Sequence, residues 1–232
     1  MKKSIIVSRF NEDINWLKDL KDFKKIIIYN KGNSLSNHDN FQIINLDNVG
    51  RESHTWIYHI VKNYNNLDDI IIFLQGRIDD LGCMAFLDPN DYILNINKFG
   101  YAASRYGLLG PLHWGWNVGI EKNVKYLNAW RSKDISRSKI GFRAFSKILF
   151  PDIPFFAATS YGGCFAVKKD LILQYDLNFY KNLLKILSAN KNPIEGHYME
   201  RLWCYMFTKN KIFFKAIQDV LYTKIENLFN DN

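Results

Sequence analysis

Short apolar runs rich in β-branched residues alternate with more polar stretches along the first third of the chain. Four of these runs have the length and composition of buried strands: residues 4–8, 25–30, 41–46 and 69–74. Strands of this kind, separated by amphipathic helices, are typical of a mostly parallel sheet covered on both faces. The pattern therefore predicts an α/β fold, Rossmann-like, with helices on both faces of the sheet.

Amphipathic stretches supply the helices that such a sheet needs. After residues 48–52, apolar residues recur through residue 64 at the spacing of one helical face. A shorter helix ending at Leu20 is predicted after the first strand, with Asn11 or Asp13 as its cap.

The second half of the chain has a weaker pattern. It contains an aromatic stretch at 112–116 and a basic stretch at 131–147 that can form a helix. A glycine-led strand is predicted at 161–167, followed by helical residues 171–188 and a strong helix at 195–207. Because no linker or internal repeat divides the 232 residues, we expect one domain.

Charge, cysteine content and the length of the apolar runs indicate which partners and which compartment to expect. The formal net charge of +8 favours anionic partners, but the lysines are spread out and form no nucleic-acid arm. The cysteines, Cys83, Cys164 and Cys204, are far apart and are interpreted as thiols in a reducing compartment. The apolar run at residues 5–7 is too short for a signal peptide, and no run is long enough to cross a membrane. We therefore expect a cytoplasmic protein with at most peripheral membrane contact.

Polar clusters directly follow three of the predicted strands. They are Arg9, Asn11, Glu12 and Asp13; Asn48, Gly50, Arg51 and Glu52; and Gln75, Gly76 and Arg77 with Asp79 and Asp80. Ligands of open parallel sheets bind at the carboxyl ends of the strands. Three clusters in equivalent positions therefore predict a binding site at that edge.

The second cluster has the clearest chemistry. Asn48 can cap the helix, Gly50 lets backbone amides approach a ligand, and the helix N-terminus attracts a phosphate. Arg51 can add a bidentate contact to that phosphate. The alternative is an ordinary capped helix with an exposed arginine.

The helix at 195–207 is apolar around most of its circumference. One polar stripe interrupts it, formed by His197, Glu200, Arg201 and Cys204. Such a stripe predicts a cavity or a buried ion pair. Glu200 is accordingly the best candidate for a general base, and a structural pair with an arginine is the alternative.

Metal binding stays open. No D-x-D triplet occurs, although Asp79 and Asp80 can bind a hard cation such as Mn²⁺ or Mg²⁺. His54 and His59 do not share a helix face well, which argues against zinc. The absence of G-x-S-x-G and Walker A motifs disfavours hydrolases and kinases of those types.

Several segments together carry a resemblance to a domain family of unknown function found in fungi, bacteria and viruses. They are residues 7–13, 48–55, 72–76, 162–167 and 197–203. That family in turn resembles GT-A glycosyltransferases. The resemblance implies one GT-A-like domain over residues 1–232, with a nucleotide-binding half at about 1–80 and an acceptor half at about 81–232.

The resemblance also implies roles for individual residues. Nucleotide-binding residues would be Arg9, Asn11, Glu12, Asn48, Gly50, Arg51, Gln75, Gly76 and Arg77. Acceptor-binding residues would be Trp114, Trp116, Gly162, Gly163 and His197. The segment Gln75-Gly76-Arg77 occupies the position of the metal motif but is not acidic, so Arg77 or lysines would neutralise the leaving diphosphate.

We therefore expect a glycosyltransferase that moves a sugar from a nucleotide-sugar donor to a glycan or lipid-linked acceptor, with inversion. Glu200, Asp79 and Asp80 are the candidate catalytic bases. No nucleic-acid partner is expected. The alternative is a non-catalytic nucleotide- or carbohydrate-binding module on the same fold.

Overall fold

The computed structural model describes residues 1–20, 22–35, 41–79, 85–96, 98–114, 135 and 140–230, without the side chains of Leu112 and 223–230. Asp80 and Trp116, two of the predicted site residues, lie outside the described residues. So does most of the basic stretch that precedes residue 140.

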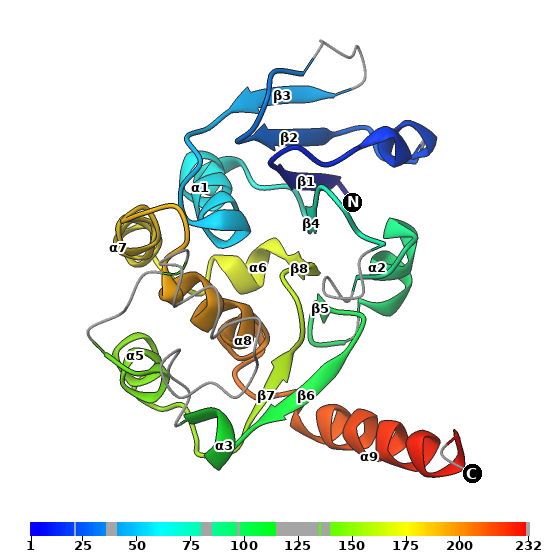
Figure 1. Cartoon of the computed structure of the whole chain (residues 1–232), viewed down its shortest axis with the longest axis vertical. Coiled ribbons are helices and arrows are strands. Elements are labelled where there is room, and N and C mark those ends of the chain that lie inside the picture. Colours follow the sequence, from blue (N-terminus) through cyan, green and yellow to red (C-terminus); the bar gives the residue numbers. More distant parts are fainter. Residues whose placement is uncertain are drawn as a thin grey trace.

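Six strands form the main sheet, in the order β3-β2-β1-β4-β8-β5. Their bounds are β1 Lys3–Arg9, β2 Ile26–Asn30, β3 Gln42–Asn45, β4 Ile70–Gln75, β5 Tyr101–Ala102 and β8 Phe165–Lys168. The first four strands pair in parallel, whereas β8 runs antiparallel to β4 and to β5. The predicted α/β fold with a mostly parallel sheet is confirmed (Figure 1).

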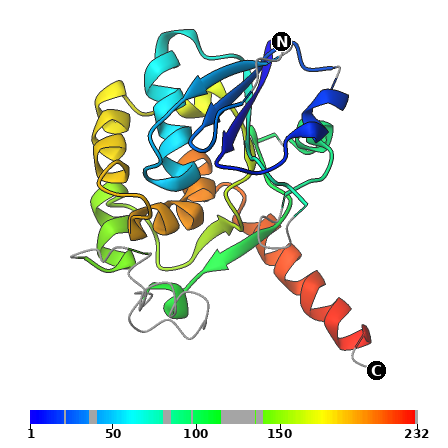
Figure 2. The same cartoon turned by 45° about the horizontal axis from the view of Figure 1, so that its top comes forward.

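Helices cover both faces of this sheet. The helices and 3-10 turns of the described residues, not all of which touch the main sheet, are η1 Asn15–Asp19, α1 Arg51–Asn63, η2 Tyr64–Asn66, α2 Pro89–Asn95, α3 Pro111–Trp114, α5 Phe142–Leu149, α6 Lys169–Ile172, α7 Leu177–Leu187, α8 Ile194–Thr208 and α9 Phe213–Asn230. Ile6 and Phe73 enter a core shared with α1, α7 and α8. Their strand neighbours Ile5 and Leu74 point the other way, into a core with η1 and α2. Figure 2 shows α1 and η1 on opposite sides of the sheet.

A second, smaller unit of structure adjoins the main sheet. Strands β6 (Tyr106–Leu109) and β7 (Ala157–Ser160) pair in antiparallel fashion. Helix α8 packs against β7, and α9 packs against β6 before it extends away from the body of the molecule (Figure 1). Nearly all of α8 is buried, which explains why its sequence is apolar on most sides.

Local structure differs from the predictions at several turns. The helix predicted up to Leu20 is only the 3-10 turn η1, whose N-cap is Ile14. Asp13 accepts a hydrogen bond from the Asn15 backbone N–H at 2.9 Å, which forms a local turn before η1. The glycines of the predicted strand 161–167 lie in a turn, and β8 begins only at Phe165.

Candidate functional site

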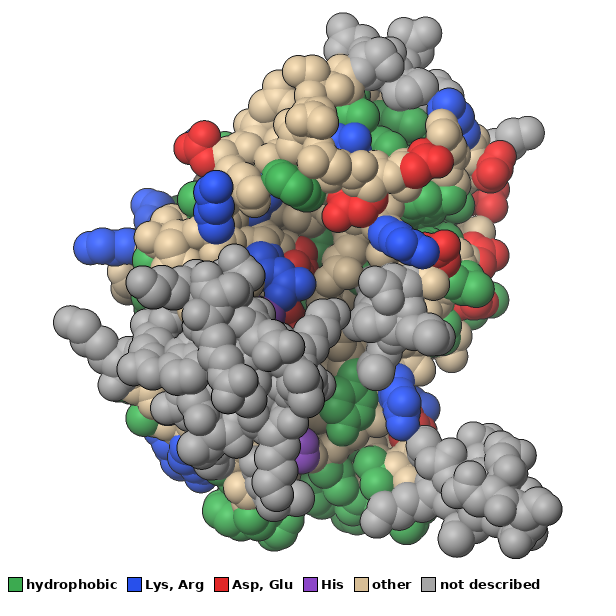
Figure 3. Space-filling model, in the orientation of Figure 1, with side chains coloured by type: hydrophobic (Ala, Val, Ile, Leu, Met, Phe, Trp, Pro, Cys, Tyr) green, Lys and Arg blue, Asp and Glu red, His purple; other side chains and the backbone are tan. Residues whose placement is uncertain are grey.

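A pocket of about 340 Å³ opens where the carboxyl ends of β1, β2 and β4 meet. It is lined by Ser8, Arg9, Phe10, Glu12, Lys31, Asn48, Arg51, Glu52, Gln75, Lys191 and Asn192. Each of the three polar clusters predicted from the sequence contributes to this lining. Figure 3 shows basic and acidic side chains next to one another near the middle of this face.

Helix α1 begins at a left-handed turn that brings Arg51 to the pocket. Gly50 has φ 62° and Arg51 has φ 50°. A Cβ at Gly50 would lie 2.2 Å from the Leu187 carbonyl oxygen, so the position requires glycine. The predicted capping role of Asn48 is wrong, because Gly50 is the N-cap and no side chain caps the helix. Asn48 nevertheless lines the pocket beside Arg51.

Arg51 brings together the two glutamates of the site. Its Nη1 lies 3.8 Å from Glu200 Oε1, and its Nε lies 3.5 Å from Glu52 Oε2. The side chains of Glu200 and Glu52 are 16% and 8% exposed. The carboxyl group of Glu200 is also close enough to that of Glu52 to raise its pKa. The ion pair predicted as the alternative role of Glu200 is therefore present, with Arg51 as the cation.

His197 completes this cluster from within α8. Its Nδ1 lies 3.5 Å from Glu200 Oε1 and its Nε2 lies 2.9 Å from Asn192 Oδ1. Burial, and next the charge of Arg51, lower the pKa of His197 to about 3, so this imidazole is neutral. A neutral His197 can donate from Nε2 to Asn192 and accept from Arg51 Nη1, 3.3 Å from its Nδ1.

The pKa of Glu52 is raised above that of an ordinary glutamate. Burial is the largest cause, Arg51 opposes it, and the neighbouring Glu200 adds to it through its charge and its hydrogen bond. Glu52 therefore keeps a proton at a pH where an exposed glutamate has lost it.

Lys31 is a pocket residue that the sequence reasoning missed. It follows β2 directly, and its Nζ donates to the carbonyl oxygens of Val49 and Arg51 and lies 3.4 Å from His54 Nδ1. Burial lowers its pKa to about 7. The sequence position of Lys31 could have predicted this, because the lysine directly follows a buried strand and so lies at the same edge of the sheet as the other clusters.

The cluster after β1 mainly shapes the loops of the pocket. Arg9 is buried and donates to Asn30 Oδ1 at 2.7 Å and to the Glu12 carbonyl at 3.0 Å. Asn11 Oδ1 accepts from the Asn33 backbone N–H at 2.8 Å. Arg9 and Glu12 line the pocket, whereas Asn11 faces a neighbouring one.

The neighbouring pocket has a volume of about 720 Å³ and receives the cluster after β4. Arg77 and Asp79 line it and form an exposed ion pair at 2.8 Å. The hydrogen bond from Arg77 lowers the pKa of Asp79, which makes Asp79 a weaker base. Gly76 has little room for a side chain, since a Cβ there would lie 2.8 Å from Glu12 Oε2.

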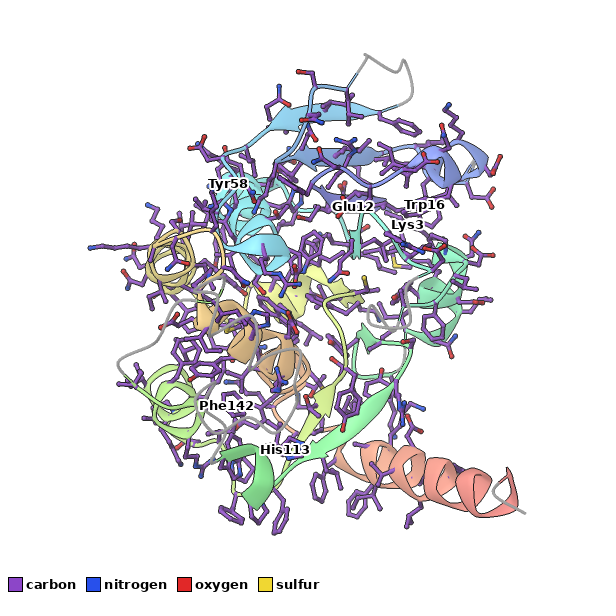
Figure 4. The ribbon with its side chains drawn as sticks, in the orientation of Figure 1. Lys3, Glu12, Trp16, Tyr58, His113 and Phe142 are labelled. Atoms are coloured by element: carbon purple, nitrogen blue, oxygen red, sulfur yellow. The ribbon has the colours of Figure 1, made fainter. Side chains whose placement is uncertain are left out.

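The predicted acceptor residues do not all gather at the pocket. Gly163 packs against Glu52 and Gln75, where a Cβ would lie 3.0 Å from Glu52 Cγ and from Gln75 Nε2. Its carbonyl accepts from Trp56 Nε1, and Gly162 before it has φ 78°. Trp114 is buried against Phe142. Figure 4 shows Phe142 and His113 at the opposite end of the molecule from Glu12 and Trp16.

No group of three or more His, Cys, Asp or Glu side chains within the described part of the chain is placed to hold a metal ion. No helix within the same described ranges is long and apolar enough to cross a membrane.

Comparison with known proteins places the chain in a family without giving it an activity. A search of curated proteins found no match. The model of one family matches residues 5–222, which is nearly the whole chain. The segments at 7–13, 48–55, 72–76 and 162–167 and the helix at 197–203 all lie within that match. The chain belongs to the family described as "Protein of unknown function (DUF3431)".

Proposed function

We propose that this protein is a glycosyltransferase that moves a sugar from a nucleotide-sugar donor to a hydroxyl of a glycan or lipid-linked acceptor. One observation carries the proposal. A partly exposed carboxylate, Glu200, lies 3.8 Å from the guanidinium of Arg51, and Arg51 lines a pocket at the carboxyl edge of a mostly parallel sheet. A base for an acceptor hydroxyl and a cation for a leaving diphosphate are the two groups that sugar transfer requires.

The chemistry assigns each group a separate task. Arg51 and Lys191 line the pocket and would bind the donor phosphates as they gain negative charge. Glu200 takes the proton from the acceptor hydroxyl. The acceptor oxygen then forms a bond to the anomeric carbon as the bond from that carbon to the diphosphate oxygen breaks. This single displacement inverts the anomeric centre.

Protein cations support a reaction that depends little on a divalent ion. Arg51, Lys191 and the buried Lys31 line one pocket. Their combined charge can stabilise a diphosphate in the manner of a bound metal. The position implied for a metal motif holds Gln75 and Gly76, neither of which is acidic.

The finer GT-A-like description of the fold belongs to the same proposal. Its support is that the three segments that follow β1, precede α1 and end β4 carry the sequence resemblance and contribute Glu12, Asn48 and Gln75 to the same pocket. We also propose a donor half before about residue 80 and an acceptor half after it, because α8 brings Glu200 to Arg51, which lines the pocket.

A thermal-shift screen tests this function. Nucleoside diphosphates and sugar nucleotides are added with and without Mn²⁺, and a ligand that binds only the folded protein raises the melting temperature. The donor that binds is then tested for hydrolysis without acceptor. Slow release of the sugar supports the transferase, whereas binding of a donor without any turnover supports a non-catalytic binding module.

A further inference from the structure

Glu52 is a buried acidic residue that has no task in the transfer described above. Its Oε2 faces Arg51 Nε at 3.5 Å. Its Oε1 is buried and accepts no hydrogen bond from any residue in the described part of the chain. A buried carboxylate oxygen without a donor is unfavourable, because it has lost its hydration and gained nothing in return.

A proton on Glu52 would remove the cost of burying Oε1 without a hydrogen-bond donor, because a protonated Oε1 is itself a donor. The carboxyl groups of Glu52 and Glu200 converge on the guanidinium of Arg51, and Glu200 acts directly on the pKa of Glu52. Two carboxyl groups can hydrogen-bond to each other only when one of them carries a proton. Glu52 is the more buried of the two, with 8% of its side chain exposed against 16% for Glu200, and burial penalises the charged form of a carboxyl group. The proton therefore belongs on Oε1 of Glu52, leaving Oε2 to accept from Arg51.

We propose that Glu52 is a neutral carboxylic acid that donates a hydrogen bond to Glu200, and that it thereby orients the Glu200 carboxyl group. Glu52 is thus a positioning residue for the base. The part of this inference that concerns the base rests on the proposed function. The location of the proton does not.

The groups around Glu52 are compatible with this arrangement. Arg51, on the same helix, favours the ionised form of Glu52, but burial has the larger influence. Lys31, from the end of β2, has a pKa of about 7 and is only partly charged near neutral pH. From α8, His197 is neutral, and Arg201 donates to the His197 carbonyl at 2.8 Å.

Infrared spectroscopy at neutral pH locates the proton without any assay of activity. We expect a carbonyl band of an un-ionised carboxylic acid in the wild-type protein and in Glu200→Gln. The band should be lost in Glu52→Gln. Glu195→Gln, on the first turn of α8, is the matched control and should keep it. Absence of the band from the wild type, or its survival in Glu52→Gln, would overturn the proposal.

The pH dependence of stability gives a second, independent measurement. If the folded protein holds the Glu52 proton more tightly than the unfolded chain, Glu52 makes the unfolding equilibrium constant rise with pH above about 4.5, by up to about tenfold per pH unit. The buried histidines and Lys31, whose pKa values are lowered, contribute the opposite slope, so the measurement compares wild type and variant at each pH. Glu52→Gln should remove this contribution and still fold, since its amide N–H₂ donates where the acid O–H did. A slope unchanged by Glu52→Gln contradicts the proposal.

The positioning role is tested by two variants of similar size once a donor has been identified. Glu52→Gln retains a donor toward Glu200 and should keep kcat within about threefold, whereas Glu52→Met lacks one and should lose kcat by about tenfold or more with KM little changed. Equal losses in both variants would reject the role. If no donor is turned over, the proposed function fails while the infrared and stability results still decide where the proton is.

Discussion

Replacing Glu200 by Gln separates its catalytic role from its structural one. The variant keeps the size and hydrogen bonding of the side chain but removes its charge. The charge faces Arg51 Nη1 at 3.8 Å, and the Arg51 side chain is 41% exposed. Solvent screens a pair of this kind, so its loss should cost no more than about 1 kcal/mol of the free energy of unfolding. For a chain of this length that corresponds to a fall of about 2–4 °C in melting temperature.

The effect on turnover should be much larger. Without the carboxylate, the acceptor hydroxyl keeps its proton, and kcat should fall by roughly 10²-fold or more. Donor affinity should change little, because Arg51 and Lys191 remain in the pocket. Melting temperature, nucleotide affinity by calorimetric titration and kcat are measured on the same preparation. Glu195→Gln, one turn earlier on α8, is the matched control.

Two results would refute this reasoning. A stable variant with full activity means that Glu200 is not the base. A loss of about 3 kcal/mol or more of the free energy of unfolding means that Glu200 is half of a buried structural pair. Solvent would then not screen the Arg51–Glu200 pair, although the Arg51 side chain is partly exposed.

The remaining predictions concern the cations, the metal and the turn before α1. Arg51→Ala should fold normally and weaken donor binding, and an unchanged affinity by calorimetric titration contradicts the phosphate role. Chelator should leave most of the activity; abolition by chelator with recovery on adding Mn²⁺ would show metal dependence. Because the pKa of Lys31 is lowered to about 7, the unfolded chain binds more protons between that pH and about 10.5, so stability should rise with pH in this window. Urea unfolding at several pH values should show this rise, and Lys31→Met should reduce it. Gly50→Ala should lose about 2–4 kcal/mol in the same assay, because its Cβ would meet the Leu187 carbonyl at 2.2 Å, whereas Gly141→Ala, with nothing within 4 Å, should lose almost nothing.

The main sheet could be predicted because its parallel strands are strongly apolar. The run Ile70–Leu74 is completely buried, and its composition alone identifies it as a central strand. Strands β5, β6 and β7 were missed for the opposite reason. The sequence of β7, Ala157–Ser160, contains small and polar residues, and its burial depends on α8 lying across it. Such tertiary packing leaves no local pattern.

The location of the site was predictable, but the state of its residues was not. Parallel strands bring their carboxyl ends to one edge, so Arg51 and Gln75 were expected there and line the same pocket. The environment of Glu52 depends on neighbours far along the chain, such as Glu200 and Gly163. Trp114 shows the same limit, because an aromatic residue suited to a sugar site is instead buried in the core.

The antiparallel pairing of β8 with β4 has a consequence for the way the protein is made. Strand β4 lies in the middle of the finished sheet, yet its partner β8 comes from residues 165–168. Until that segment leaves the ribosome, the isoleucine-rich edge of β4 is an open template for pairing with other chains. We therefore expect a fragment that ends near residue 80 to aggregate when it is expressed alone. The nascent chain should likewise depend on chaperones until β8 has been added.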